Sequence, residues 1–276
     1  RLIDDELNNN QKPNTFTYHL PKIKEIEEVG RVDVGMYSPV FKEMVHKILN
    51  YTRDCFENIY AMGYTLSRGQ NLQESNIGKS IYSDVSYPNF YKLALPTNFS
   101  IYGTIDKLLY LGNRNQLKTL KQGEIIFGAE ATFRGFVVCD SKDNYITNIH
   151  GVTISNNGNI IQSIFVKSFL DYLVQEGVID CVKVGGHGGS FAQKYWDVIP
   201  FPKFPDTKQK EIACLYYNNK EYRADKFTLD NFLEKDNLFN EAAGIYELDK
   251  SAKHLKTLLN TAIDDIVNDR EVAIRF

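Results

Sequence analysis

The stretch "YWDVIPFPKFPDTKQKEI" occupies Tyr195–Ile212, and it constrains the fold more than any other part of the chain. Proline fixes φ and disfavours helix in the residue before it, so Pro200, Pro202 and Pro205 predict extended backbone over residues 199–205. Asp206 is a favourable N-cap for a helix whose apolar residues then fall on one face. We therefore predict a stiff extended strap that leads directly into a helix.

The composition is that of a globular protein of one large domain, or one domain with an appendage. The chain has 276 residues, 43% of them hydrophobic and 24% charged. It contains no apolar run of transmembrane length and no signal-peptide pattern at its start, so we expect a cytoplasmic protein without a membrane partner. The first residue is not methionine, as in a piece of a longer polypeptide. The cysteines lack zinc-type spacing and are predicted to be reduced thiols: Cys55, Cys139, Cys181 and Cys214.

The net charge of −3 is unevenly distributed. Residues 225–271 contain eleven Asp and Glu against six Lys and Arg, which leaves a slightly positive remainder. Residues 182–210 contain five lysines against two aspartates. This mildly basic stretch is compatible with phosphate contact and equally with an ordinary solvated surface.

The chain reads as α+β, with an irregular, mostly antiparallel β region between flanking helices. Residues 1–20 are polar and predict a loose lead-in, and Pro39 starts a helix that we extend towards Met62. Short apolar runs separated by turn residues predict strands over 65–155. A helix is predicted over 162–175 with Gly177 as its stop, followed by a strand at "IDCVKV" (179–184).

The C-terminal segment carries a heptad pattern. Apolar residues recur at alternating spacings of three and four, which is typical of a helix that pairs with another helix. Over about 22 residues at about 1.5 Å each, this helix is roughly 33 Å long. The alternative is a helix packed on its own domain. The heptad residues are Ile245, Leu248, Ala252, Leu255, Leu259, Ala262 and Ile266.

Signatures of catalysis are missing from the sequence. It has no NPPY or DPPY tetrad, no Gly-rich methyltransferase turn and no G-x-x-x-x-G-K-[ST] phosphate loop. The five histidines are far apart in sequence, and no pair has metal-ligand spacing. We therefore expect the chain to bind no metal or cofactor of its own.

The loop "GGHGGSFAQKY" (185–195) has four glycines in five residues. Glycines let a ligand come close to the backbone of such a loop. A helix that starts at Ser190 offers free N–H groups to a phosphate. A tight structural turn is the alternative.

The order G-G-S, then Y-W-D-V-I-P-F-P-K-F-P, then Q-K-E-I resembles the end of a target recognition domain from specificity subunits of Type I restriction–modification systems. "GRVDVGMYSP" (30–39) and "LKQGEIIFGAEATFRGFVV" (120–138) are similar to further elements of that family. Met36 and Glu124 stand where Tyr and Asp are common there. The resemblance covers about residues 31–266. Its most specific matches are Gly189, Ser190, Ile199, Pro200, Pro202, Pro205, Gln209 and Ile212.

The resemblance implies a subunit that reads double-stranded DNA while its partners perform the chemistry. The expected partners are methyltransferase (M) subunits that methylate adenine, a restriction (R) subunit, and a second specificity-type half that pairs through the C-terminal helix. The implied organisation is a lead-in over 1–30, a target recognition domain over 31–224 and a helical spacer over 225–276. One recognition domain with one helix is half of a full specificity subunit, so a homodimer, a natural half-subunit and a fragment of a longer chain stay open.

Candidate DNA-binding residues follow from the loops. Arg pairs with guanine and Gln with adenine in the major groove, and Lys contacts phosphate. The candidates are Arg68, Gln70, Arg114, Arg134, Lys183, His187, Ser190, Gln193, Lys194 and Lys203.

Three other functions are compatible with the sequence. The first is the recognition portion of a fused restriction–methyltransferase. The second is a nuclease or hydrolase with a distributed active site, and the third is an adaptor that uses only its C-terminal helix.

Overall fold

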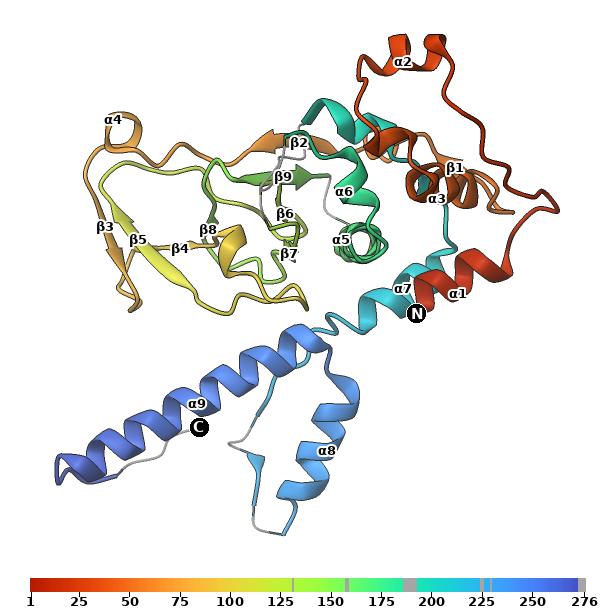
Figure 1. The fold of residues 1–276 in the computed structure, drawn as a ribbon. Helices are drawn as coiled ribbons and strands as arrows, with labels where there is room; N and C mark the ends of the chain where they lie inside the picture. The colour runs from red at the N-terminus through yellow and green to blue at the C-terminus, as the bar shows by residue number, and fades with distance from the viewer. Residues whose placement is uncertain (131, 157–158, 186–192, 224–225, 229, 273–276) are drawn as a thin grey trace. The chain divides into compact units, whose positions relative to one another are not determined.

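The computed structural model describes the chain except residues 131, 157–158, 186–192, 224–225, 229 and 273–276 (Figure 1). The fold is α+β, with small, mostly antiparallel sheets, flanking helices and a long C-terminal helix, as predicted. The chain divides into two compact units, Arg1–Gln209 and Lys210–Phe276. The first unit contains the residues of the predicted lead-in and most of those of the predicted recognition domain.

The first sheet is fully antiparallel and has the strand order β2-β9-β6-β7. Side chains alternate between its faces, so Val152 and Ile154 are fully buried while Thr153 and Ser155 lie on the opposite, polar face. Helix α5 (Ile160–Gln175) packs against this sheet at β6 and β7 (Figure 1). The strands are β2 (Thr65–Arg68), β6 (Ile125–Gly128), β7 (Gly135–Val137) and β9 (Gly151–Ser155).

The second sheet has the strand order β3-β5-β4-β8, and only its β4–β8 pair is parallel. It has a small core of its own, which contains Ile77, Leu93, Leu111, Leu117 and Ile146. The elements of this part are α4 (Glu74–Ile77), β3 (Ser80–Ser83), β4 (Tyr91–Leu93), the 3₁₀ turn Pro96–Asn98, β5 (Leu109–Asn113) and β8 (Tyr145–Ile146).

The predicted proline strap is confirmed. A 3₁₀ turn over Gln193–Val198 leads into strand β10 (Phe201–Pro202), which pairs antiparallel with β1 (Cys55–Phe56), and helix α7 (Asp206–Cys214) follows. The aromatic residues between the prolines point into the core of the first unit. The Phe201 ring lies 5.2 Å from that of Phe169, and the Phe204 ring lies 5.2 Å from that of Phe165. The strap therefore delivers two rings onto α5.

An ion pair on helix α5 binds the backbone at two places, Tyr102 and Gly135. Lys167 Nζ lies 2.7 Å from Asp171 Oδ2 and donates a hydrogen bond of 3.2 Å to the Tyr102 carbonyl. Asp171 accepts the backbone N–H of Gly135, at the start of β7, and burial raises the pKa of its carboxyl. The helix begins at the Asn159 side chain, which accepts the Gln162 N–H, and Gly177 (φ 73°) follows its end, as predicted.

The N-terminal residues are more ordered than a loose lead-in. Residues Leu2–Asn9 form helix α1, whose Ile3 and Leu7 are buried, and Glu6 Oε1 accepts the Tyr51 hydroxyl at 2.7 Å. Helix α2 (Ile23–Val29) and a 3₁₀ turn (Gly35–Tyr37) follow. Helix α3 (Pro39–Leu49) starts where predicted but ends well before Met62, because Asn50 leaves helical geometry and the short strand β1 follows.

The predicted strand at 179–184 is wrong, because Val178–Val182 form helix α6. A short apolar run does not distinguish strand from helix by periodicity alone. Tertiary contacts decide here, since Arg31 Nη1 donates to the Val182 carbonyl at 2.7 Å and Nη2 to the Lys183 carbonyl at 3.0 Å. The guanidinium thus caps the end of α6, and Asp33 Oδ1 accepts from the same Nη2 at 2.7 Å.

In the second unit, a buried carboxylate fixes the start of the long helix α9 (Ile245–Val267). Glu247 Oε2 accepts the Gly244 N–H at 2.9 Å, and Oε1 accepts the N–H groups of Asn218 and Lys220 at 2.7 and 3.3 Å. The Ile245 and Tyr246 N–H groups donate to the carbonyls of residues 215 and 216. Between these points the chain makes an excursion that contains helix α8 (Phe232–Ala242).

None of the described helices combines the length and apolarity needed to cross a bilayer. No group of three or more His, Cys, Asp or Glu in the described part of the chain has the arrangement of a metal site.

We expect Lys167→Met to lower the free energy of unfolding by about 3–5 kcal/mol, because it leaves the Asp171 carboxylate buried without its cation. Urea denaturation of the full chain measures this change. The double variant Lys167→Met with Asp171→Leu removes both charges, so its free energy of unfolding should fall by less. Equal losses in both variants would contradict an electrostatic role for the pair.

Candidate nucleic-acid interface

One edge of the first sheet gathers polar residues from three segments. Strand β2 ends at Arg68, and because β9 runs antiparallel to it, the β8–β9 loop (147–150) meets it there. Strand β6 ends and β7 begins at the same edge, so the β6–β7 loop (129–134) joins them. The edge therefore holds the predicted site residues Arg68 and Arg134, together with Glu130 and His150.

Glu130 contacts two side chains, Arg68 and His150, through separate oxygens. Oε1 lies 3.2 Å from Arg68 Nη1, and Oε2 lies 2.6 Å from His150 Nδ1. The hydrogen bond with His150 is the largest of the effects that lower the pKa of the Glu130 carboxyl, and Arg68 acts in the same direction. Arg68 Nη1 also donates to the Ile149 carbonyl at 3.2 Å. We name these three residues the Arg68–Glu130–His150 cluster.

The cluster has the parts of a carboxylate–imidazole dyad, which is one element of general-base chemistry. Covalent catalysis by such a dyad needs a nucleophilic hydroxyl or thiol next to the second imidazole nitrogen. Within the described residues, no hydroxyl or thiol bonds to His150 Nε2.

Arg134 is half-buried and holds a loop. Its Nη1 donates to the Phe99 carbonyl at 2.6 Å, which ties the β6–β7 loop to the segment after the 3₁₀ turn Pro96–Asn98. The neighbouring Ile101 and Tyr102 side chains are exposed. Arg134 was predicted to contact DNA, and one of its guanidinium nitrogens is already used in this bond between two loops.

Gln70 forms a clamp between two segments. Its Nε2 donates to the Lys118 carbonyl at 2.7 Å, and its Oε1 accepts the Lys118 N–H at 2.9 Å. The side-chain amide therefore pairs with the backbone of Lys118 as a neighbouring strand would pair with it. Both polar atoms of the Gln70 side chain are used. Gly69 permits this arrangement, since a Cβ there would lie 2.1 Å from the Asn148 carbonyl oxygen.

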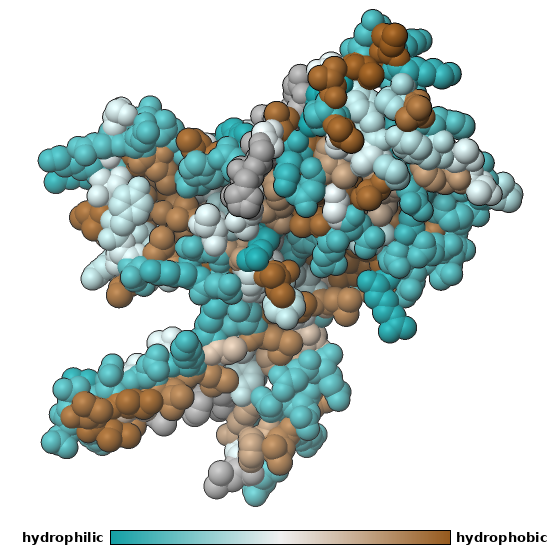
Figure 2. Space-filling view, in the orientation of Figure 1, coloured by the Kyte–Doolittle hydropathy of each residue, from teal (hydrophilic) through white to brown (hydrophobic). Residues whose placement is uncertain are grey.

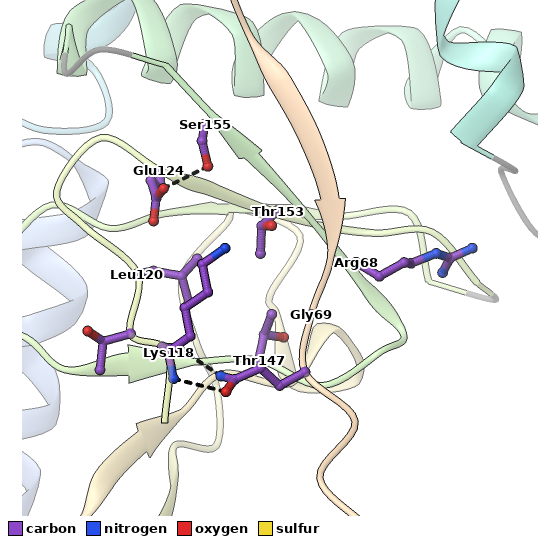
Figure 3. A pocket seen from close by; sticks show the side chains of 10 residues that line it. Arg68, Gly69, Lys118, Leu120, Glu124, Thr147, Thr153 and Ser155 are labelled. Carbon is purple, nitrogen blue, oxygen red and sulfur yellow. Dashed lines mark hydrogen bonds between the residues drawn. The ribbon is translucent and has the colours of Figure 1, made fainter. Parts of the chain in front are cut away.

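A small polar pocket lies beside this clamp (Figure 3). Glu124 and Ser155 line it with a hydrogen bond of 2.7 Å between Ser155 Oγ and Glu124 Oε1. Its volume of ≈ 30 Å³ suits on the order of two water molecules and excludes a nucleotide.

A wider hollow of ≈ 1010 Å³ lies on the second sheet. Arg114, Lys79 and Phe90 are among its lining residues. Arg114 is exposed and makes no hydrogen bond or ion pair with the described residues. Its guanidinium group is therefore free to bind a ligand, unlike that of Arg134.

The structure describes the side chains of only some of the predicted phosphate-binding residues. Lys183 Nζ lies 2.6 Å from Asp180 Oδ1, and Lys203 Nζ lies 2.6 Å from Asp54 Oδ2. Both pairs lie at the surface, so solvent and salt screen them. His187 and Ser190 lie outside the described residues, as do the side chains of Gln193 and Lys194.

The predicted heptad helix is confirmed as α9, and its apolar stripe is exposed (Figure 2). Ala252 is exposed as well, and Ala262 is half-buried. The large heptad side chains have exposed fractions of 37% for Ile245, 37% for Leu248, 39% for Leu255, 61% for Leu259 and 64% for Ile266.

Sequence reasoning missed Glu130 and His150. They are 20 residues apart from one another, and Arg68 is 62 residues from Glu130. The one available signal was that all three segments flank predicted strands, but only the strand order shows that they share an edge.

No protein-family model matches this chain, and no curated protein matches it. Among solved structures, the chain is similar to one from work described as "Structural basis underlying complex assembly and conformational transition of the type I R-M system". The match has a TM-score of 0.40 and 13% sequence identity. It covers 75% of this chain and 44% of that chain, so this chain spans less than half of its length.

We expect Gln70→Ala to speed hydrogen exchange at the Lys118 amide and to lower the free energy of unfolding by about 1 kcal/mol, because both clamp bonds are lost. Native-state hydrogen exchange resolves the amide, and Gln116→Ala is the matched control on an exposed residue. Unchanged protection of Lys118 would show that the clamp does not form in solution.

Proposed function

We propose that this chain is the sequence-specific DNA-binding subunit of a restriction–modification system, and that partner subunits carry out adenine methylation and restriction. The observation that carries the proposal is the presence of two exposed surfaces of unlike chemistry. The first unit presents guanidinium groups on loops, and the second presents an apolar heptad stripe. A subunit that reads DNA and recruits other polypeptides needs both.

The first surface has the donors that base reading requires. A guanidinium group offers two parallel N–H donors that match O6 and N7 of guanine. Arg114 has all of its donors available to a ligand, and Arg68 has Nε and Nη2 without a partner among the described residues. Arg134 contributes its remaining N–H groups at the edge of the first sheet.

Two surface lysines of the first unit supply phosphate contacts in the proposal. Lys183 and Lys203 each hold a surface carboxylate. Exposed ion pairs contribute about 0–1 kcal/mol, so exchange of the carboxylate for a DNA phosphate is inexpensive. Each such contact strengthens binding to every sequence alike. In the proposal His187, Ser190, Gln193 and Lys194 add phosphate contacts from the Gly-rich loop.

The second surface is the stripe on α9. At about 1.5 Å per residue, a helix of 23 residues is about 35 Å long, close to one turn of DNA. Pairing with a second copy of this helix buries the exposed leucines and isoleucines and sets two recognition units about one DNA turn apart. The same helix pair offers a surface to methyltransferase subunits. This arrangement reads a bipartite DNA site.

We expect the full chain to select a preferred sequence from a random duplex library, and Arg114→Ala to weaken binding to that sequence by about 10- to 100-fold. The reason is the loss of a bidentate contact to a base. Fluorescence anisotropy with the selected and a scrambled duplex, at several salt concentrations, measures the change.

Arg53→Ala is the matched control, since Arg53 is also exposed and its loss changes the charge equally. Equal effects of the two substitutions would mean that Arg114 acts only through its charge. Cleavage of DNA by this chain alone with Mg²⁺ would overturn the non-catalytic assignment.

We expect wild-type protein to form a dimer through α9, and the pair Leu255→Glu and Leu259→Glu to make it monomeric. Burial of a leucine stabilises an interface by about 1.5–3 kcal/mol, and the substitutions also bring like charges together across the pair. Light scattering after gel filtration gives the mass in solution.

Thr257→Glu is the control, because this residue is exposed on the same helix but outside the heptad stripe. A monomeric wild-type chain that stays monomeric at high concentration would rule out self-pairing. Mixing with a methyltransferase subunit then tests whether a different partner covers the stripe.

A further inference from the structure

The Arg68–Glu130–His150 cluster joins three loops at one carboxylate. Arg68 comes from the end of β2, Glu130 from the β6–β7 loop and His150 from the β8–β9 loop. Neither oxygen of Glu130 is shared, since one faces Arg68 at 3.2 Å and the other faces His150 at 2.6 Å. The carboxylate cannot rotate without breaking one of the two bonds, so His150 fixes the oxygen that Arg68 uses.

The arrangement leaves specific donors facing outward. Arg68 uses Nη1 towards Glu130 and the Ile149 carbonyl, and no bond from Nε or Nη2 to a described residue is formed. The side chains remain partly exposed, with fractions of 35% for Arg68 and 56% for His150. The Arg68 guanidinium is therefore held at one end and open at the other.

We infer that Glu130 is a positioning residue that holds the Arg68 guanidinium in place for a single guanine of the DNA site. This inference rests on the proposed function and adds to it a base, a reading residue and the group that orients it. Arg68 donates from its open edge to O6 and N7 of the guanine. Glu130 does not touch the DNA.

The physical advantage is preorganisation. An arginine side chain is long and flexible, and a free one loses much of its rotamer freedom when it binds a base. The two bonds of Nη1 remove part of that freedom before DNA arrives. Stability alone is a weak reason for the cluster, since exposed ion pairs contribute little to folding.

The charge of Glu130 has a second effect that makes the inference testable. A carboxylate close to DNA repels every phosphate, whatever the sequence. Its removal should strengthen binding to unrelated duplexes while it weakens the choice of the correct base. A substitution that merely damaged the fold would weaken binding to both.

The test is selection from a random duplex library by the full-length wild type and by Arg68→Ala, Glu130→Ala and Glu130→Gln. We expect Arg68→Ala and Glu130→Ala to lose preference at the same single guanine, with a loss of affinity for the selected duplex on the order of 10-fold. Affinity for a scrambled duplex should rise in Glu130→Ala. Glu130→Gln, which keeps the shape but not the charge, should lie between wild type and Glu130→Ala.

Glu27→Ala is the matched control, because Glu27 is exposed on α2 and its loss changes the charge equally. Loss of preference in Glu130→Ala at a different position, or at no position, overturns the inference while DNA reading by the chain stands. A wild-type chain that selects no sequence contradicts the proposed function itself.

Discussion

The packing of two strap phenylalanines onto α5 is the contact on which the rest of the first unit depends. Phe201 and Phe204 meet Phe169 and Phe165 at ring separations of 5.2 Å, and Phe204 also meets Tyr51 at 5.4 Å. The prolines restrict the unfolded chain at these positions, so less conformational entropy is lost when the rings are placed. With α5 fixed from this side, its other face supports the first sheet and the loops at the sheet's edge.

The sequence predicted those elements that its local chemistry determines. Proline spacing predicted the strap, heptad spacing predicted α9, and Gly177 marked the end of α5. The sequence did not predict the structure where a contact with a distant residue determines it. Arg31 caps the end of α6 from 151 residues away, and no local pattern in "IDCVKV" reveals that contact. The sequence also did not reveal the clamp of Gln70, because its partner Lys118 is 48 residues further along.

The two proposed surfaces rely on different physics. In the proposal, reading bases depends on polar groups held in fixed positions, as the bond between Arg68 and Glu130 illustrates. Pairing of α9 depends on burial of apolar area and tolerates changes among hydrophobic side chains. The two surfaces belong to separate compact units of the chain.

The buried Glu247 carboxylate has a consequence for sequence variation within the second unit. Its bonds to Gly244, Asn218 and Lys220 join the two ends of the excursion that carries α8. Insertions or deletions between these ends leave the first turn of α9 where it is. The angular phase of the heptad stripe is then independent of the length of the excursion. The excursion can therefore change in size while the stripe keeps the same direction.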